Sequence, residues 1–408
     1  MPPGPSFQSK LNDFDFGGNT MNGSLSLPSS TWQRIGWAAL ASGVLCTAGC
    51  SNLATTASST ALQGTGGSIT GRLHGGSQPV AFATVKLWYA GQGVPSPASV
   101  GATTTTANDG AGSFSFNRNP VNGQPGAGNT YSCPLSDPLV YVIASGGNTL
   151  NSGDPAVNND ASVFIAPFGQ CSTISAASFV NMTEVTTVAT MAALQQYFNP
   201  LTAATPSNPV PESFSTDGSG LAKSAMINAF ATIRNLVDLS SGTAITSRII
   251  PAGSITAGVG YAGTSVTATP ESTKINLMAN ILASCINTTT SSASVCTTLF
   301  SNALPPDPVV TSRPYPTVFP MATDVLQAAY YMLTNPTSGS TASLTNLFDL
   351  SPAVGAPFQP VLTSAPSDWT VAISYSSSST CGANGGHLIQ SAKDLAIDIY
   401  GGVLLANF

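Results

Sequence analysis

The hydrophobic pattern of this 408-residue chain changes its period near residue 180, and this change limits the folds open to it. Before it, apolar and polar residues alternate, as around Val85 and Leu87, which is typical of half-buried strands. After it, apolar residues recur every three or four positions, as at Ile275, Met278 and Leu282, which is typical of amphipathic helices. We therefore expect a multidomain α+β protein with a β domain followed by a helical domain.

The β domain is expected over residues 67–180. An Asn-Asp-Gly turn around Asp109 separates two of its strands, and we expect the Asp109 carboxylate to accept hydrogen bonds inside this turn. The run LVYVIA at 139–144 predicts a buried strand. The candidate strands cover 68–75, 79–90, 103–106, 113–116 and 139–144.

The order of these strands and turns resembles a carboxypeptidase regulatory-like domain, a small β-sandwich of the transthyretin-like kind. The resemblance lies between residues 69 and 116, and it implies a non-catalytic module that stiffens or presents other domains. The positions that carry it are Ile69, Gly71, Pro79, Val80, Ala83, Val85, Thr106, Asp109, Gly110, Gly112, Phe114 and Phe116.

The helical domain is expected over residues 181–350. Glu184, Glu271 and Asp324 each lie near a predicted helix start, where a carboxylate complements the helix dipole or accepts bonds from free amides. No second acid, base or nucleophile accompanies Glu184, so we expect a structural role for it. The candidate helices cover 183–198, 221–239, 271–286, 321–334 and 344–350.

An export signal is expected in the leader, residues 1–49. The apolar run 35–49 follows Arg34 and has the length of a signal peptide. Small residues precede Cys50, which resembles a bacterial lipobox and implies lipidation of Cys50. Thr47 departs from the usual Leu of such motifs, so cleavage by an ordinary signal peptidase stays an alternative.

The residues on either side of this signal lead to two further predictions, on the start of translation and on a tether. Translation from Met21 instead of Met1 would give a shorter, more ordinary region before the apolar run. Residues 50–66 are small and polar without periodicity, which predicts a flexible tether.

The low charge content and the negative net charge limit the classes of partner that this chain can bind. Only 7% of the residues are charged, against about 25% in ordinary soluble domains. The formal net charge is -6, which excludes nucleic acid as a partner. We expect an outer-membrane or cell-surface lipoprotein, otherwise a periplasmic or secreted protein. Its expected partners are the membrane, through the lipid anchor, and an extracellular polysaccharide or another envelope protein.

Five cysteines remain after Cys46 and Cys50. An exported protein meets an oxidising compartment, so we expect pairing of Cys133 with Cys171 and of Cys285 with Cys296. Cys381 is left without an expected partner.

The end of the chain, residues 351–408, is expected to be a β segment. Its last part resembles the first blade of an NHL-type β-propeller at Leu388, Ala396, Ile397, Asp398, Gly401, Val403, Leu405, Ala406 and Asn407. One blade cannot bury both faces of its sheet, so this resemblance implies a truncated relative of a propeller protein. The alternative is a terminal hairpin that packs on the helical domain.

A wider resemblance covers most of the chain. The motif Glu184 to Ala189 (EVTTVA), Cys171, Cys285, Cys296 and the stretch 357–369 resemble exported proteins of acidobacterial type, in which a regulatory-like β domain precedes a helical segment. That group carries no activity that can be transferred to this chain.

The sequence assigns no catalytic, cofactor-binding or metal-ligating residue, so we expect a structural or binding protein rather than an enzyme. The histidines, His74 and His387, have no neighbouring Cys-x-x-Cys motif. Two alternatives stay open. One is a relative of a propeller-bearing hydrolase or lactonase, and the other is a carbohydrate-binding protein that uses Trp88 and Trp369.

Overall fold

The computed structural model describes residues 68–93, 96–119, 127–149, 154–175, 178–200, 210, 212–250, 266–306, 319–352, 354–377, 392–397 and 403–407. The leader, the proposed lipidation site Cys50, the tether, Cys381 and His387 lie outside these ranges. The described residues belong to one compact unit, which covers residues 60–408.

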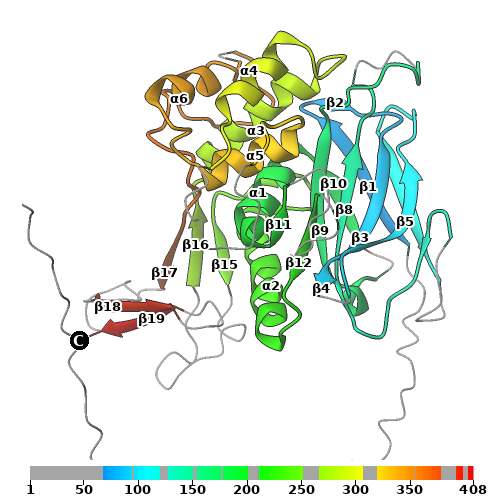
Figure 1. The fold of residues 1–408 in the computed structure, drawn as a ribbon, viewed down its shortest axis with the longest axis horizontal. Coiled ribbons are helices and arrows are strands. Elements are labelled where there is room, and N and C mark those ends of the chain that lie inside the picture. Colours follow the sequence, from blue (N-terminus) through cyan, green and yellow to red (C-terminus); the bar gives the residue numbers. More distant parts are fainter. Residues whose placement is uncertain are drawn as a thin grey trace, which may run out of the picture. The chain divides into compact units, whose positions relative to one another are not determined.

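The fold is a mixed α+β fold whose strands form several small sheets. Figure 1 shows the helices grouped beside the strands of the first half of the chain. The strands are β1 (Ile69–Gly75), β2 (Gln78–Pro79), β3 (Thr84–Tyr89), β4 (Gly91–Gln92), β5 (Ser99–Thr105), β6 (Ser113–Arg118), β7 (Thr130–Tyr131), β8 (Leu139–Ser145), β9 (Val163–Gln170), β10 (Phe179–Met182), β11 (Phe198–Asn199), β12 (Ser213–Thr216), β13 (Val237–Asp238), β14 (Thr243–Ala244), β15 (Arg248–Ile250), β16 (Val266–Pro270), β17 (Ile373–Ser377), β18 (Ala392–Ile397) and β19 (Val403–Asn407).

The described residues also form α-helices and two short 3-10 helices. They are η1 (Cys171–Thr173), α1 (Glu184–Leu194), η2 (Gln195–Tyr197), α2 (Gly220–Ile233), α3 (Ser272–Ile286), α4 (Ser294–Asn302), α5 (Val325–Thr334) and α6 (Thr341–Phe348).

Two sheets dominate the first half of the chain. One has the order β10-β1-β6-β7 with β2 beside β1, and the other has the order β5-β3-β8-β9. Their buried residues, including Ile69, Leu87 and Phe116, belong to one hydrophobic core. All residues of β8 except Ser145 are buried, because the helices cover the face that the first sheet does not.

A close approach between β1 and β6 explains one glycine of the regulatory-like pattern. Gly71 lies opposite Phe114 in the antiparallel pair. A Cβ atom at Gly71 would lie 2.3 Å from the Phe114 ring, so the ring occupies the space of the missing side chain. Phe114 itself is buried in the core.

The central helix α1 connects the two halves of the structure. It packs against β9 and against the helices α2, α3 and α5. The sequence predicts one apolar stripe on this helix, but Thr186, Thr187 and Thr190 are also fully buried. The hydrogen bonds of Thr186 and Thr187 with β9 and with the preceding turn make this burial possible.

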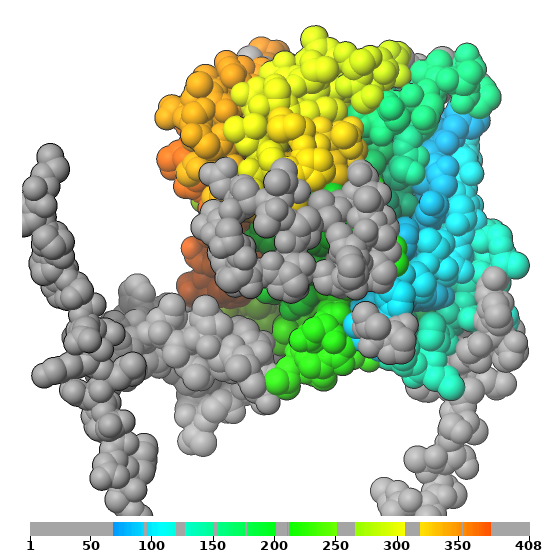
Figure 2. Space-filling view, in the orientation of Figure 1, coloured from blue at the N-terminus to red at the C-terminus, as the bar shows by residue number. Residues whose placement is uncertain are grey.

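The expected boundary at residue 180 falls inside β10, which pairs in parallel with β1. The core continues across it, since Leu73 and Val188 belong to the same cluster. Figure 2 shows the yellow residues of α3 and α4 directly against the teal residues that precede β9. One of these contacts is a hydrogen bond of 2.9 Å from Asn159 Nδ2 to Cys285 O of α3.

The region expected to be helical also contains the short strands β11–β16. Four of them, β11, β13, β14 and β15, have two or three residues, which is too few to show a period of two in the sequence. The predicted helix 221–239 ends at Ile233, and Val237 belongs to β13 instead. Gly242 lies with a φ of 72° in the turn between β13 and β14.

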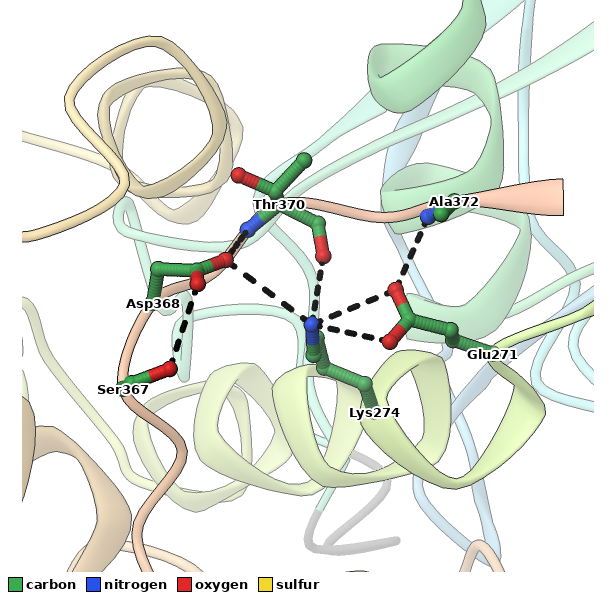
Figure 3. A network of polar contacts seen from close by, with 6 residues as sticks. All are labelled: Glu271, Lys274, Ser367, Asp368, Thr370 and Ala372. Atoms are coloured by element: carbon green, nitrogen blue, oxygen red, sulfur yellow. Dashed lines mark hydrogen bonds and ion pairs between the residues drawn. The ribbon is translucent and has the colours of Figure 1, made fainter.

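Lys274 attaches the segment before β17 to the start of α3 (Figure 3). Its Nζ lies 3.1 Å from Glu271 Oε1 and donates to Thr370 O at 2.7 Å. The Glu271 carboxylate also accepts from Ala372 N at 2.9 Å. Glu271 therefore has the structural role that the sequence predicts, and β17 continues from this attachment to pair with β16.

In the segment that resembles a propeller blade, the structure describes the antiparallel pair of β18 and β19.

Candidate functional site

A surface hollow of about 600 Å³ lies where β9, the start of β10 and the chain after α2 meet. We call it the larger hollow. It has apolar and polar walls, and two arginines contribute to it. Its lining consists of Pro167, Phe168, Ser178, Phe179, Arg234, Val237, Asp238, Leu239, Ser240, Ile245, Ser247 and Arg248.

A second hollow of about 210 Å³, the smaller hollow, adjoins the first. The two share Pro167, Phe168, Arg234 and Leu239, so Arg234 lies at their junction. We refer to both together as the arginine cleft. The other residues of the smaller hollow are Leu139, Gly169, Gln170, Thr173, Ile227, Phe230 and Ala231.

The end of α2 and the hairpin that follows it build this cleft. Ser219 caps the start of α2 by accepting a bond from Ala222 N, and Arg234 follows the last helical residue. The β13–β14 hairpin then turns at Gly242, where a Cβ atom would lie 2.7 Å from Asn181 O. The turn therefore requires glycine.

The hairpin is held against β10. Asn181 donates its backbone N–H to Leu239 O and its side-chain amide to Ser241 O, both at 2.8 Å. Thr183 Oγ1 donates to Gly242 O at 2.7 Å. The wall that carries Leu239 is thus fixed by hydrogen bonds from two directions.

Among the residues that the structure describes, the two arginines of the cleft form no ion pair with a carboxylate. The Arg234 side chain is exposed and Arg248 is partly exposed. Arg248 donates to the Arg234 carbonyl, and within the described part of the chain neither guanidinium forms an ion pair. Asp238 accepts instead from Ser240 N and Oγ, and these bonds lower the pKa of Asp238.

Disulfide bonds join Cys133 to Cys171 and Cys285 to Cys296, the two pairs expected from the sequence. Cys171 follows β9 directly, and Gln170 and Thr173 on either side of it line the smaller hollow. The first disulfide therefore fixes one end of the cleft wall. Both bonds indicate an oxidising, non-cytoplasmic location.

Glu184 is fully buried at the first position of α1. Its Oε1 and Oε2 accept from Gly76 N at 2.8 and 3.1 Å, which joins α1 to the turn after β1. Burial raises the pKa of Glu184 to about 8, while the amide bonds act in the opposite direction. This is the amide-binding role expected for Glu184.

A second pair of acids lies at the start of α5. Asp324 Oδ1 caps the helix by accepting from Leu326 N and Gln327 N at 2.8 and 2.9 Å. The Glu212 carboxyl lies beside it, and among the described residues its buried Oε1 has no hydrogen-bond partner. Burial and the neighbouring Asp324 raise the pKa of Glu212 to about 9.

The proton of this pair belongs to Glu212. Amide donors favour the charged form of Asp324, and Glu212 has no such donors among the described residues. Glu212 is therefore a neutral acid that donates to Asp324 at neutral pH. No sequence pattern links Glu212 to Asp324, because the two residues are 112 positions apart (324 minus 212) in segments with no shared motif.

Asp109, His74 and Ser219 each form a structural hydrogen bond. Asp109 Oδ1 accepts from Ala111 N at 2.9 Å, as an Asp in such a turn is expected to do. His74 Nδ1 lies 3.1 Å from Asn181 Oδ1, and burial lowers the pKa of His74. Ser219 is occupied as the cap of α2.

The two tryptophans considered for sugar binding pack inside the protein. Trp369 is fully buried. Trp88 is partly buried and stacks on Tyr141 with ring centroids 6.3 Å apart. Trp369 is therefore closed to a sugar, whereas Trp88 packs beside Tyr141 and keeps part of its surface exposed.

Among the described residues, no group of three or more His, Cys, Asp or Glu side chains could hold a metal ion. Within the same ranges, no helix has the length and apolar character needed to cross a membrane. Comparison with known proteins found no matching family model, no matching curated protein and no matching solved structure.

Proposed function

We propose that this chain is an exported envelope protein with a binding role, and that the arginine cleft is its binding site. The observation that carries the proposal is the position of Arg234 at the junction of two hollows without an ion-pair partner among the described residues. The larger hollow alone has a volume typical of small-molecule sites, which run from about 300 to 1,000 Å³.

The disulfide bonds support the export part of this proposal. Two bonded pairs are unusual in the reducing cytosol and common in exported proteins. The apolar run 35–49 and the small residues before Cys50 support secretion and a lipid anchor at that cysteine. The cell surface or outer membrane is the location that we propose.

The first half of the chain then acts as a rigid support. Its two sheets share a core and carry the Asp109 turn between β5 and β6, an arrangement in line with a regulatory-like β-sandwich. β9 is the last strand of one sheet and also a wall of the cleft. We propose that this domain presents the cleft at a distance from the membrane.

Mass spectrometry of the mature N-terminus tests the export and anchoring. We expect a peptide that begins at acylated Cys50, and we expect Cys50→Ser to move the protein out of the membrane fraction. Cys46→Ser is the matched control, because it lies in the same leader and should leave the anchor intact. A full-length, reduced protein in the cytosol would contradict the proposal.

A further inference from the structure

We infer that the arginine cleft binds a small organic carboxylate, with the carboxylate at Arg234 and an apolar group in the smaller hollow. This inference rests on the proposed function, because it names the ligand class of the same cleft. Three observations carry it, namely the free guanidinium, the apolar lining and the modest charge.

The free guanidinium provides the anion site. Arg234 has no ion pair within the described residues, although Asp238 lines the same hollow. The Asp238 carboxylate is occupied by the backbone and hydroxyl of Ser240. A guanidinium presents a planar fork of donors that fits the two oxygens of a carboxylate. Arg234 is therefore available to an anion from solution.

The smaller hollow provides a place for an apolar group. Leu139, Phe168, Ile227 and Phe230 line it together with Arg234. Its volume is about 210 Å³, and an apolar protein cavity of about 150 Å³ is large enough to take benzene. A phenyl ring or a short acyl chain thus fits beside the guanidinium.

The charge of the cleft limits the ligand to a small anion. Arg234 and Arg248 are its cationic residues and Asp238 is its acidic one, which leaves a formal charge of +1 (two minus one). The whole chain has a net charge of -6. One carboxylate matches the formal charge of the cleft, and a chain with a negative net charge disfavours the approach of a polyanion.

Titration with 4-phenylbutyrate and its uncharged analogue 4-phenylbutanamide, followed by ligand-observed NMR, tests the inference on the full chain with both disulfides formed. We expect the carboxylate to bind about tenfold more tightly than the amide. Arg234→Gln should remove this difference. Arg72→Gln is the matched control, because Arg72 is an exposed arginine on β1 that lies outside the cleft.

A second variant tests the apolar end without changing any charge. Ala231 is exposed on α2 and lines the smaller hollow, so Ala231→Leu should fill the hollow and weaken both probes about equally. Helix α2 should persist, because leucine is a good helix former.

The outcomes of these titrations distinguish the carboxylate inference from the proposal that the cleft is a binding site. If both probes bind alike and Arg234→Gln changes nothing while Ala231→Leu weakens both, the carboxylate inference fails and the cleft remains a binding site. If neither probe binds the wild-type chain, the inference and the proposed binding site fail together. The export test at Cys50 is independent of either result.

Discussion

Carboxyl groups are buried at two helix N-termini of this protein. Different interactions offset the free-energy cost of that burial at each terminus. At α1, Glu184 faces the backbone N–H of Gly76, so the acid has a fixed donor from another element. At α5, Asp324 has the helix amides, while Glu212 has the Asp324 carboxylate beside it and, among the described residues, no donor for its buried Oε1. A buried acid can thus be stabilised by backbone donors or by keeping its own proton.

The largest expected effect comes from removing the acid at α1. Glu184→Ala leaves the buried Gly76 N–H without an acceptor and creates a cavity, so we expect a loss of about 3 kcal/mol in unfolding free energy. Glu184→Gln keeps the volume and an acceptor oxygen, and should cost about 1 kcal/mol. Urea denaturation of both variants measures the difference, and equal losses would show that the Gly76 bond contributes nothing.

Two buried glutamates, Glu184 at α1 and Glu212 at α5, make the stability of the fold depend on pH. Because the folded-state pKa values of Glu184 and Glu212 are raised to about 8 and 9, their contribution is full below the usual glutamate pKa and is lost as pH rises through those values. We expect the unfolding free energy to fall by roughly 2 kcal/mol from pH 7 to pH 9. His74, whose pKa is lowered, stays neutral across this window.

The variant Glu212→Gln isolates the contribution of the Glu212–Asp324 pair to the pH dependence of stability. The amide still donates to Asp324 but cannot ionise, so the fall in stability between pH 7 and pH 9 should become smaller. Glu271→Gln is the control, because this carboxylate lies at the surface beside Lys274. Denaturation midpoints at the two pH values give the comparison, and an unchanged slope in Glu212→Gln would refute the proton assignment.

The smallest effect concerns a hydroxyl near the α1 terminus. Thr187 Oγ1 accepts from Ile165 N on β9 at 3.2 Å, while the buried Thr190 hydroxyl has no partner among the described residues. Thr187→Val should therefore cost about 1 kcal/mol and Thr190→Val close to nothing, because only the first leaves a buried donor unpaired. Thermal unfolding of both variants checks this, and equal shifts would argue against the α1–β9 bond.

The N-termini of α1 and α5 show which features of the structure can be predicted from the sequence. Thr183 as a cap and Glu184 as a binder of amides were predictable, since both follow from residue types at a helix start. The fully buried EVTT segment was not, because its threonines depend on the edge of β9. Glu212 was missed for the same reason, since its partner comes from a distant element.

The arginine cleft was also beyond the sequence. Arg234 follows a predictable amphipathic helix, but Phe168 and Phe179 come from strands more than 50 residues earlier. Their meeting depends on the β13–β14 hairpin, whose first strand falls inside the helix that the sequence predicts over 221–239. A hairpin of two-residue strands has too few positions to show alternation.

The α+β class, the main strands and helices, and both cysteine pairings follow from the sequence alone. Local periodicity predicts the elements, a short Ser- and Thr-rich loop joins Cys285 to Cys296, and Cys133 and Cys171 flank a strand-like stretch. Only the tertiary structure decided that β10 joins the first sheet, that α1 is buried on nearly all sides, and that Arg234 opens into two hollows. These features depend on contacts between residues far apart in the chain, and a buried group acquires its donors and its pKa only from such contacts.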